Sequence, residues 1–186
     1  MDEAPRFRIF FVCTGNQARS PIAAAWIARA LAPLRVAVGS AGTMPRRSGP
    51  VLAEAAATAR ELGLDVSRHA SSHVSAYDLS PADLVIGFEF HHVAAAVVDG
   101  GAPASKTFLL RELNRLVRGL PPAPGPDPFA RARTSIELAD RLRSRTDHVL
   151  GDDIRDPAGR RIGVFREIVW EVVRECEEMT RLLFGL

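Results

Sequence analysis

The chain of 186 residues is 47% hydrophobic and 25% charged, with a formal net charge of +2. This composition is typical of a globular protein and carries too little charge to indicate nucleic-acid binding. No apolar run approaches the roughly 20 residues of a membrane span, and the first residues lack the pattern of a secretory signal, so neither is expected.

One domain over residues 1–186 is the expectation for this length. Two cysteines, Cys13 and Cys176, lie far apart in the chain. They allow at most one disulfide, which does not fit a disulfide-rich secreted scaffold. We therefore expect a reducing, cytoplasmic environment, and the sequence does not indicate an oligomeric state.

Short apolar runs alternate with helical patterns over the first 117 residues. Residues 7–12 form a continuous apolar run that predicts a buried strand, and Pro21 favours the first turn of the helix that follows. Strands are further expected at residues 35–38, 84–88 and 107–109, and helices at residues 22–32, 51–62, 91–98 and 110–117. Strands that alternate with helices form a parallel sheet, so we predict an α/β fold with helices on both faces.

The rest of the chain reads as a connection and two helices. Residues 119–128 contain five prolines and predict an irregular surface connection. Helices are expected at residues 129–145 and 162–183. In the second of these, apolar side chains recur every three or four residues, which predicts a stripe packed against the core that includes Cys176.

Residues 13–20 read C-T-G-N-Q-A-R-S and lie between the first expected strand and the first expected helix. A loop at that place directs backbone N–H groups and the positive end of the helix dipole toward its centre, where they bind an oxyanion. The same positive potential favours a thiolate, the form of cysteine that attacks. We therefore interpret Cys13 as a nucleophile beside a phosphate-binding loop rather than as a buried apolar side chain.

Four residues of this loop have separate expected roles. Gly15 and Asn16 tolerate left-handed backbone conformations, which allows the loop to curl tightly. Arg19, six residues after the cysteine, can bind the same phosphate through paired hydrogen bonds. The hydroxyl of Ser20 can donate a hydrogen bond to the sulfur and stabilise the thiolate.

Four motifs stand in order along the chain: V-C-T-G-N-Q-A-R-S-P-I-A from Val12, S-A-G-T from Ser40, A-D-L-V-I from Ala82 with a histidine after it at His91 or His92, and D-I-R-D-P-A-G from Asp153. With these motifs the chain resembles the low-molecular-weight protein tyrosine phosphatases. The resemblance implies a flavodoxin-like fold of three layers with a four-stranded parallel sheet, a cysteinyl-phosphate intermediate, and no metal or other cofactor. It also implies a phosphorylated protein or a small phosphate ester as the substrate.

Cleavage of a phosphate ester through a cysteine needs a proton donor for the leaving oxygen and a base for the water that releases the phosphate. Two Asp-Pro pairs compete for this role, Asp127-Pro128 and Asp156-Pro157. In the family the Asp-Pro of the acid precedes the last helix. The resemblance therefore favours Asp156 and leaves Asp127 as a turn residue.

The resemblance assigns three catalytic roles: Cys13 as nucleophile, Arg19 as phosphate clamp, and Asp156 as general acid and then base. The phosphate is expected to be bound by the loop residues Thr14, Gly15, Asn16, Gln17, Ala18 and Ser20. Two residues outside the loop are expected to support it: Ser40, and His69, which matches a family histidine that braces the loop.

Three departures from the family concern redox behaviour and specificity. Many members have a second loop cysteine where this chain has Ala18, so protection of oxidised Cys13 by a disulfide within the loop is not expected. Residues 44–47 (M-P-R-R) and 158–161 (A-G-R-R) replace aromatic residues that usually line the cleft, which removes stacking surface for phosphotyrosine. Gln17 stands where tyrosine-specific members usually carry Ile and protein-arginine phosphatases Thr.

The sequence thus predicts a phosphomonoester hydrolase, in the first place a protein tyrosine phosphatase. Three alternatives stay open: a phosphate-binding regulatory protein with little or no turnover, a thioredoxin-coupled arsenate reductase, and a protein-arginine phosphatase. The reductase is the least favoured of the enzymes, since it needs further cysteines and Cys176 lies in an expected core stripe.

Overall fold

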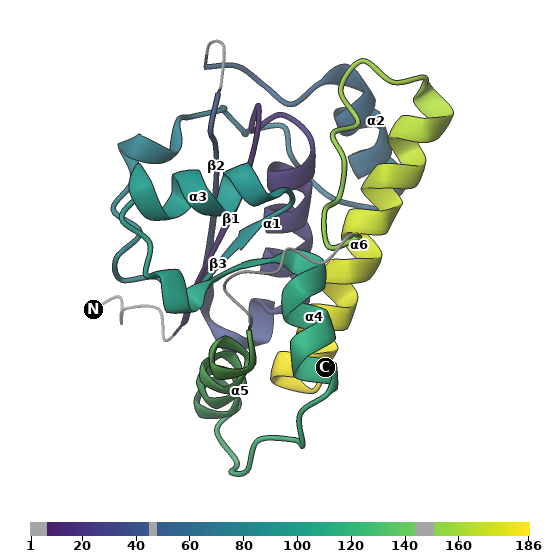
Figure 1. Ribbon diagram of the computed structural model, residues 1–186. Coiled ribbons are helices and arrows are strands. Elements are labelled where there is room, and N and C mark those ends of the chain that lie inside the picture. Colours follow the sequence, from purple (N-terminus) through teal and green to yellow (C-terminus); the bar gives the residue numbers. More distant parts are fainter. Residues whose placement is uncertain (1–6, 45–47, 144–150) are drawn as a thin grey trace, which may run out of the picture.

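The computed structural model describes residues 7–44, 48–143 and 151–186 of the chain (Figure 1). Four strands form one parallel sheet: β1 (Phe7–Cys13), β2 (Val36–Gly42), β3 (Leu84–Gly87) and β4 (Thr107–Leu109). Their order across the sheet is β2-β1-β3-β4. β1 is therefore an inner strand, and Cys13 is its last residue.

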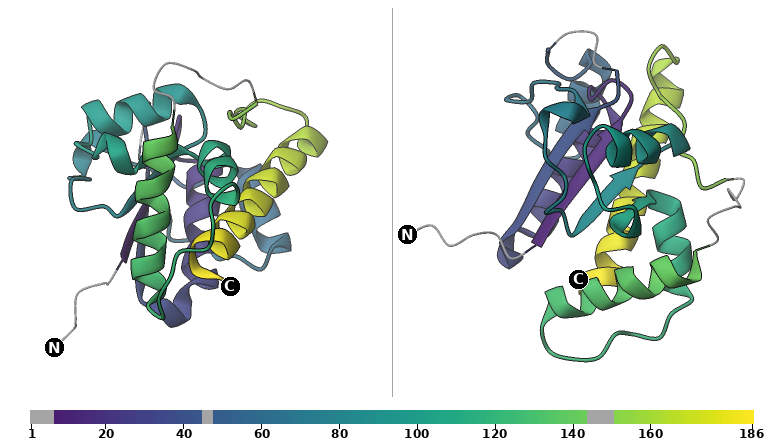
Figure 2. Two further views of the ribbon diagram at one scale, coloured as in Figure 1. Left: turned by 60° about the horizontal axis from the view of Figure 1, so that its bottom comes forward. Right: turned by 60° about the vertical axis from the view of Figure 1, so that its left-hand side comes forward.

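Helices pack on both faces of this sheet (Figures 1 and 2). The described residues form six α-helices: α1 (Arg19–Ala30), α2 (Ala53–Glu61), α3 (Phe90–Val98), α4 (Leu110–Arg118), α5 (Pro128–Leu142) and α6 (Ile162–Phe184). Three 3-10 helices are shorter: η1 (Ala32–Leu34), η2 (Val74–Ala76) and η3 (Ala104–Lys106). None of the helices in the described part of the chain has the length and apolar character to cross a membrane.

The alternation of side chains along β1 produces the layers. Phe7, Ile9 and Phe11 are buried in a core cluster with side chains of α1, α4, α5 and α6. Val12 points to the other face and belongs to a smaller cluster with Ala96 of α3. This arrangement confirms the predicted α/β fold of three layers with a four-stranded parallel sheet.

Apart from α1, β2 and α5, the predicted elements are found within two residues of their expected bounds. β2 extends four residues beyond its expected end at residue 38. Gly39 and Ser40 have low strand propensity, but both pair in parallel register with β1. A Cβ at position 39 would lie 2.5 Å from the ring of Phe10, so that the close pairing requires glycine there. The extension carries Ser40 toward the end of β1 that holds Cys13.

The proline-rich connection ends one residue earlier than predicted. Pro128 is the first residue of α5, and the carboxylate of Asp127 caps this helix by accepting a hydrogen bond from Phe129 N at 3.1 Å. The ring of Phe129 stacks 5.9 Å from that of Phe7, the first residue of β1. The start of α5 therefore lies at the opposite end of β1 from Cys13. The expected end of this helix at residue 145 lies outside the described residues, and the single domain stays a prediction.

Candidate active site

The loop between β1 and α1 ends in a helix start that no side chain caps. α1 begins at Arg19, three residues earlier than predicted, so Arg19 and Ser20 belong to its first turn. The N-cap residue is Ala18, whose methyl group cannot accept a hydrogen bond from the first N–H groups of the helix. The positive end of α1 is thus open toward the loop.

The backbone of this loop turns its carbonyl groups outward. Four carbonyl oxygens accept hydrogen bonds from other segments at 2.7–2.9 Å: Cys13 from Thr43 N, Thr14 from Met44 N, Asn16 from His69 Nε2, and Gln17 from Leu52 N. A trans peptide points its C=O and the next N–H in opposite directions. The N–H groups of residues 14, 15, 17 and 18 consequently face the inside of the loop, as an oxyanion cradle requires.

Asn16 holds the loop in shape. It has a left-handed φ of 52°, whereas Gly15 does not, so the conformational freedom expected of both residues is used by Asn16 alone. Its Nδ2 donates to Ser20 Oγ and to Ser40 Oγ, both at 2.9 Å, and its Oδ1 accepts from Ser72 N at 3.1 Å. The structure therefore brings the predicted supporting residues together, with Ser72 as an addition.

The sulfur of Cys13 lies inside this network. Cys13 is 2% exposed, and its Sγ accepts a hydrogen bond from Asn16 N at 3.2 Å. The Oγ of Ser20 is 3.0 Å from the sulfur. Ser20 Oγ accepts from Asn16 Nδ2, and its single proton has two acceptors within reach, Ala41 O at 3.3 Å and the sulfur at 3.0 Å. Donation to the sulfur would stabilise a thiolate at Cys13.

Arg19 is buried beside the loop, with 1% of its surface exposed. Its Nη1 donates to Glu89 Oε2 at 2.6 Å and to Ile154 O at 2.8 Å. Its Nη2 donates to Thr14 Oγ1 at 3.1 Å and forms an ion pair with Asp156 Oδ2 at 2.8 Å. The Nε of Arg19 is buried and has no partner among the described residues, so one donor of this guanidinium is left unsatisfied.

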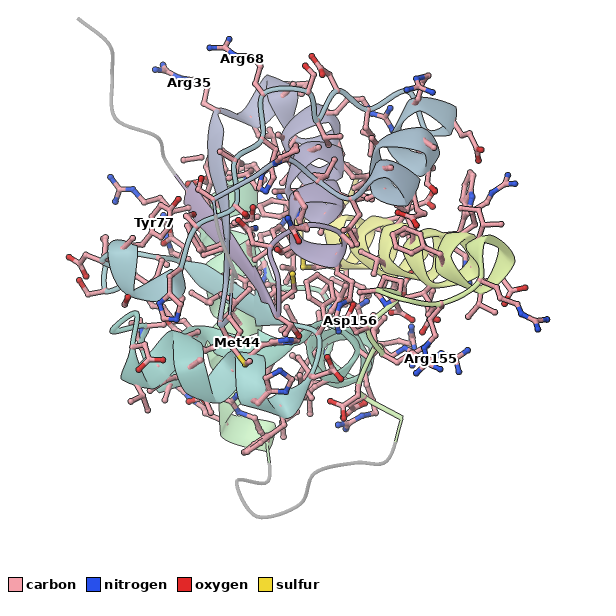
Figure 3. The ribbon with its side chains drawn as sticks, turned by 90° about the horizontal axis from the view of Figure 1, so that it is seen from above. Arg35, Met44, Arg68, Tyr77, Arg155 and Asp156 are labelled. Carbon is pink, nitrogen blue, oxygen red and sulfur yellow. The ribbon has the colours of Figure 1, made fainter. Side chains whose placement is uncertain are left out.

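The position of the two aspartates differentiates the Asp-Pro pairs. Asp156 ion-pairs with Arg19, and its other oxygen accepts from Ala158 N at 3.0 Å. Figure 3 looks onto this end of the molecule and shows Asp156 near the middle of the face, with Arg155 directed outward. Asp127 caps α5 at the far end of β1. The structure therefore brings Asp156, and not Asp127, to the loop.

Glu89 and His92 lie against the loop, although sequence reasoning gave Glu89 no role and left the histidine open between positions 91 and 92. They form the capping box of α3. His92 Nδ1 accepts from Glu89 N at 2.9 Å, so its proton is on Nε2, which donates to Thr14 Oγ1 at 3.0 Å. The sequence did contain a signal for this pair. An acidic residue directly after a predicted strand, with a histidine three residues later, can form a capping box at a helix start.

Burial and the positive charge of Arg19 keep His92 neutral. Burial, then Arg19, then His91 lower the pKa of His92 from 6.5 to about 2. The neutral ring can therefore act as a fixed donor to Thr14 over the physiological pH range. It is not an ion-pair partner for Glu89, whose Oε2 lies 3.8 Å from Nε2.

Glu89, His91 and His92 also form a group whose possible metal-ligand atoms lie within 4.8 Å of one another. Both ring nitrogens of His92 are hydrogen-bonded, and the Glu89 carboxylate is paired with Arg19. A metal ion would have to break these contacts, so the group fits a support of the loop better than a metal centre.

Two residues beside the loop, which we call its rim, carry exposed apolar side chains. Met44, whose N–H bonds to Thr14 O, is 70% exposed, and Phe90, which follows Glu89, is 62% exposed. The side chain of Gln17 is turned to the loop before α2, where its Nε2 donates to Pro50 O at 3.2 Å. Phe90 is an aromatic side chain that the expected cleft positions lack.

Comparison with known proteins gives one consistent group. The sequence pattern of the family described as low molecular weight phosphotyrosine protein phosphatase matches residues 8–139. The chain is 32% identical over 143 residues to a protein-arginine-phosphatase of Geobacillus stearothermophilus. This match covers 75% of the present chain and 95% of the relative. It is 28% identical over 145 residues to the low molecular weight protein-tyrosine-phosphatase Wzb of Salmonella typhi, which covers 75% of this chain and 88% of that protein.

Among solved structures, the fold is similar to that of a low molecular weight protein tyrosine phosphatase from T. tengcongensis. The TM-score is 0.66 at 26% sequence identity, and the match covers 94% of this chain and 98% of that one. The family match ends at residue 139 and therefore does not include Asp156. The ion pair with Arg19 is what places Asp156 beside the loop.

The neutral state of His92 makes stability fall in mild acid. Between pH 6.5 and about 2 the unfolded chain binds a proton on this ring that the folded chain does not, so acid favours unfolding. From pH 7 to pH 5 this amounts to about 2 kcal/mol of unfolding free energy. Urea unfolding at pH 7 and pH 5 measures the effect: the unfolding free energy of wild type should fall by about 2 kcal/mol more than that of His92→Asn. The exposed neighbour provides the control, since His91→Asn should keep the wild-type dependence; equal losses in all three proteins would contradict the prediction.

Gly42 is required where β2 passes the loop. A Cβ there would lie 2.7 Å from Thr14 O and 3.0 Å from Asn16 N. We expect Gly42→Ala to lower the unfolding free energy by about 1–3 kcal/mol and to weaken phosphate binding about tenfold by displacing inward N–H groups. Calorimetry with inorganic phosphate and urea unfolding measure both effects. Gly163→Ala, which meets no atom within 4 Å, is the matched control; unchanged phosphate affinity in Gly42→Ala would be the contrary result.

Proposed function

Because the chain belongs to the low molecular weight phosphotyrosine protein phosphatase family, we propose that it hydrolyses phosphate monoesters on proteins through a phosphocysteine formed on Cys13. The observation that carries the proposal is the ring of inward N–H groups beside the sulfur, closed by the unpartnered Nε of the buried Arg19. A tetrahedral oxyanion supplies acceptors for all of these donors at once.

In the first proposed step, the Cys13 thiolate attacks the phosphorus of the bound ester. The S–P bond forms while the bond from phosphorus to the leaving oxygen breaks. Asp156 donates its carboxyl proton to that oxygen, so the product leaves as a neutral alcohol or phenol. The N–H groups of the loop and Arg19 hold the three remaining phosphoryl oxygens in the transition state.

In the second proposed step, water releases the phosphate. The Asp156 carboxylate takes a proton from a water molecule as this water attacks the phosphorus, and the S–P bond breaks. The sulfur leaves as a thiolate, which accepts hydrogen bonds from Ser20 Oγ and Asn16 N. Inorganic phosphate is the second product, and Asp156 is again protonated.

The ion pair between Arg19 and Asp156 supports this use of the aspartate. A phosphate that binds the guanidinium competes with the carboxylate for the same Nη2. Once displaced, the carboxyl group stays within reach of the phosphate, because the backbone of Ala158 holds its other oxygen. Glu89 keeps its contact with Nη1, so the guanidinium plane is held during the exchange.

For the substrate, we propose a phosphorylated protein side chain, with phosphotyrosine preferred. The apolar rim supports this preference, since Phe90 and Met44 offer surface for an aromatic ring. The relatives include both a protein-arginine-phosphatase and a protein-tyrosine-phosphatase. Phosphoarginine is therefore the competing substrate that an assay must include.

The second cysteine does not support arsenate reduction. Cys176 is 0% exposed within the core stripe of α6, and burial, followed by the charge of Glu175, raises its pKa. A thiol in this state is a poor partner for a disulfide with Cys13. We also propose a cytoplasmic location, because the reaction needs Cys13 as a free thiol.

Substitution of the two principal residues should separate their roles. Cys13→Ser should abolish turnover of aryl phosphates, because the hydroxyl is a far weaker nucleophile. Asp156→Asn should lower kcat/KM on phenyl phosphate by about 100-fold or more and should affect para-nitrophenyl phosphate much less, because a good leaving group needs little proton transfer. Steady-state assays from pH 5 to 7.5 measure both.

Asp127→Asn is the matched control, since it alters the other Asp-Pro pair, and it should retain wild-type rates on both esters. If wild type binds vanadate but does not turn over either ester, the protein is a phosphate-binding module and the proposal fails. A loss in Asp127→Asn that equals the loss in Asp156→Asn would refute the role given to Asp156.

Truncation of Phe90 should test the substrate preference. Phe90→Ala should lower kcat/KM on a phosphotyrosine peptide about fivefold to tenfold, because ring stacking contributes on the order of 1 kcal/mol. The same variant should change hydrolysis of a phosphoarginine peptide less than about twofold. Val98→Ala removes an exposed apolar side chain at the other end of α3 and should change neither. Equal losses on both peptides in Phe90→Ala would argue against a tyrosine-binding rim.

A further inference from the structure

Two arginines of α4 contact the chain segment that leads to Asp156. Arg111 Nη1 donates to the carbonyl oxygens of Gly151 at 3.0 Å and Asp153 at 3.1 Å. Arg115 donates to the carboxylate of Asp152 through Nη2 at 2.7 Å and through Nε at 3.3 Å. Three consecutive residues, 151–153, are therefore tied to one face of α4.

The pair of Arg115 and Asp152 has an energetic reason to persist. Asp152 is only 6% exposed, and a carboxylate removed from water needs a charged or hydrogen-bonding partner. Arg115 supplies two donors in a planar fork, which fixes the orientation of the carboxylate as well as its position. Removal of the guanidinium would leave a buried charge and release this end of the segment.

Arg111 is itself anchored to α6. It forms ion pairs with Glu171 and with Glu175, whose Oε1 lies 3.4 Å from its Nε. Its guanidinium thus joins three parts of the molecule: α4, α6 and the segment before Asp156. Because the two helices pack against each other, they give the segment a rigid frame.

The same segment is also held at Ile154, by contacts that do not involve α4. Its N–H donates to Phe88 O at 2.6 Å, its carbonyl accepts from Arg19, and its side chain is fully buried. Asp156 follows two residues later. The contacts of residues 151–154 therefore place the carboxyl group of Asp156. α4 provides the contacts at residues 151–153.

We propose that Arg111 and Arg115 are positioning residues for proton transfer by Asp156. They contact neither Cys13 nor the loop, and they act by holding residues 151–153. This inference rests on the proposed function, in which Asp156 is the general acid. A displacement of about 1 Å in a catalytic group can cost on the order of 100-fold in rate. Loss of an α4 arginine that shifts residues 151–153 would therefore displace the carboxyl group of Asp156 and lower the rate.

The role predicts a loss that depends on the leaving group. The loop that binds phosphate is built from residues 13–20 and their neighbours, which the α4 arginines do not contact. Arg115→Gln should therefore leave the inhibition constant of inorganic phosphate within about twofold of wild type. Its kcat/KM on phenyl phosphate should fall about tenfold or more, while that on para-nitrophenyl phosphate should fall less than about threefold. Arg111→Met should show the same pattern.

Arg118→Gln is the matched control. Arg118 lies one turn further along α4 and pairs with Glu178 of α6 at 3.1 Å, so its loss removes a more exposed arginine–carboxylate pair of the same helix without touching residues 151–153. It should change both esters by less than about twofold. Arg115→Lys retains the charge but not the fork, and it should recover part of the rate on phenyl phosphate.

The outcomes distinguish this inference from the proposed function. If Asp156→Asn shows the leaving-group effect and Arg115→Gln does not, or if Arg118→Gln shows it equally, the positioning role is wrong. The proposed phosphatase activity is then unaffected. If wild type hydrolyses neither ester, the proposed function fails first. Should Arg115→Gln not fold, Asp152→Asn decides the question, since it weakens the same ion pair from the other side. It should give the same selective loss on phenyl phosphate. An unchanged ratio of the rates on phenyl phosphate and para-nitrophenyl phosphate would overturn the positioning role.

Discussion

The structure around the loop depends on the burial of one guanidinium group. Arg19 is 1% exposed, and a charge removed from water is stable only when counter-charges and acceptors surround it. Three segments far apart in the sequence supply them: Thr14 in the loop, Glu89 at the start of α3, and residues 154–156 before α6. The need to satisfy Arg19 therefore draws the catalytic candidates to one point at the end of the sheet.

The parts of the site that the sequence predicted are those encoded by local chemistry. Cys13, Asn16, Arg19 and Ser20 lie within eight residues, and the geometry of a strand, a tight loop and a helix start limits where they can point. The fold class followed in the same way from alternating strands and helices. The motif from Asp153 also indicated the Asp-Pro pair that lies beside Arg19, although local sequence alone makes Asp127 an equal candidate.

What the sequence did not predict depends on contacts between distant segments. Glu89 is an ordinary acidic residue until α3 packs beside Arg19, and the arginines of α4 are three among 24 basic residues. β2 was predicted four residues short, because Gly39 and Ser40 have little strand propensity of their own and pair only because β1 lies beside them. Pro128 was assigned to the connection, since five prolines in ten residues conceal a helix start that Asp127 caps.

The pairing of one guanidinium with two carboxylates also sets the charge of the site. Arg19, Glu89 and Asp156 sum to a formal −1, the Cys13 thiolate of the proposed mechanism brings the sum to −2, and the neutral His92 adds nothing to offset it. A phosphate dianion that entered without any other change would bring the sum to −4 in a poorly hydrated space. Like charge therefore opposes the entry of phosphate, and the N–H groups of the loop and the guanidinium of Arg19 are the groups that offset this repulsion.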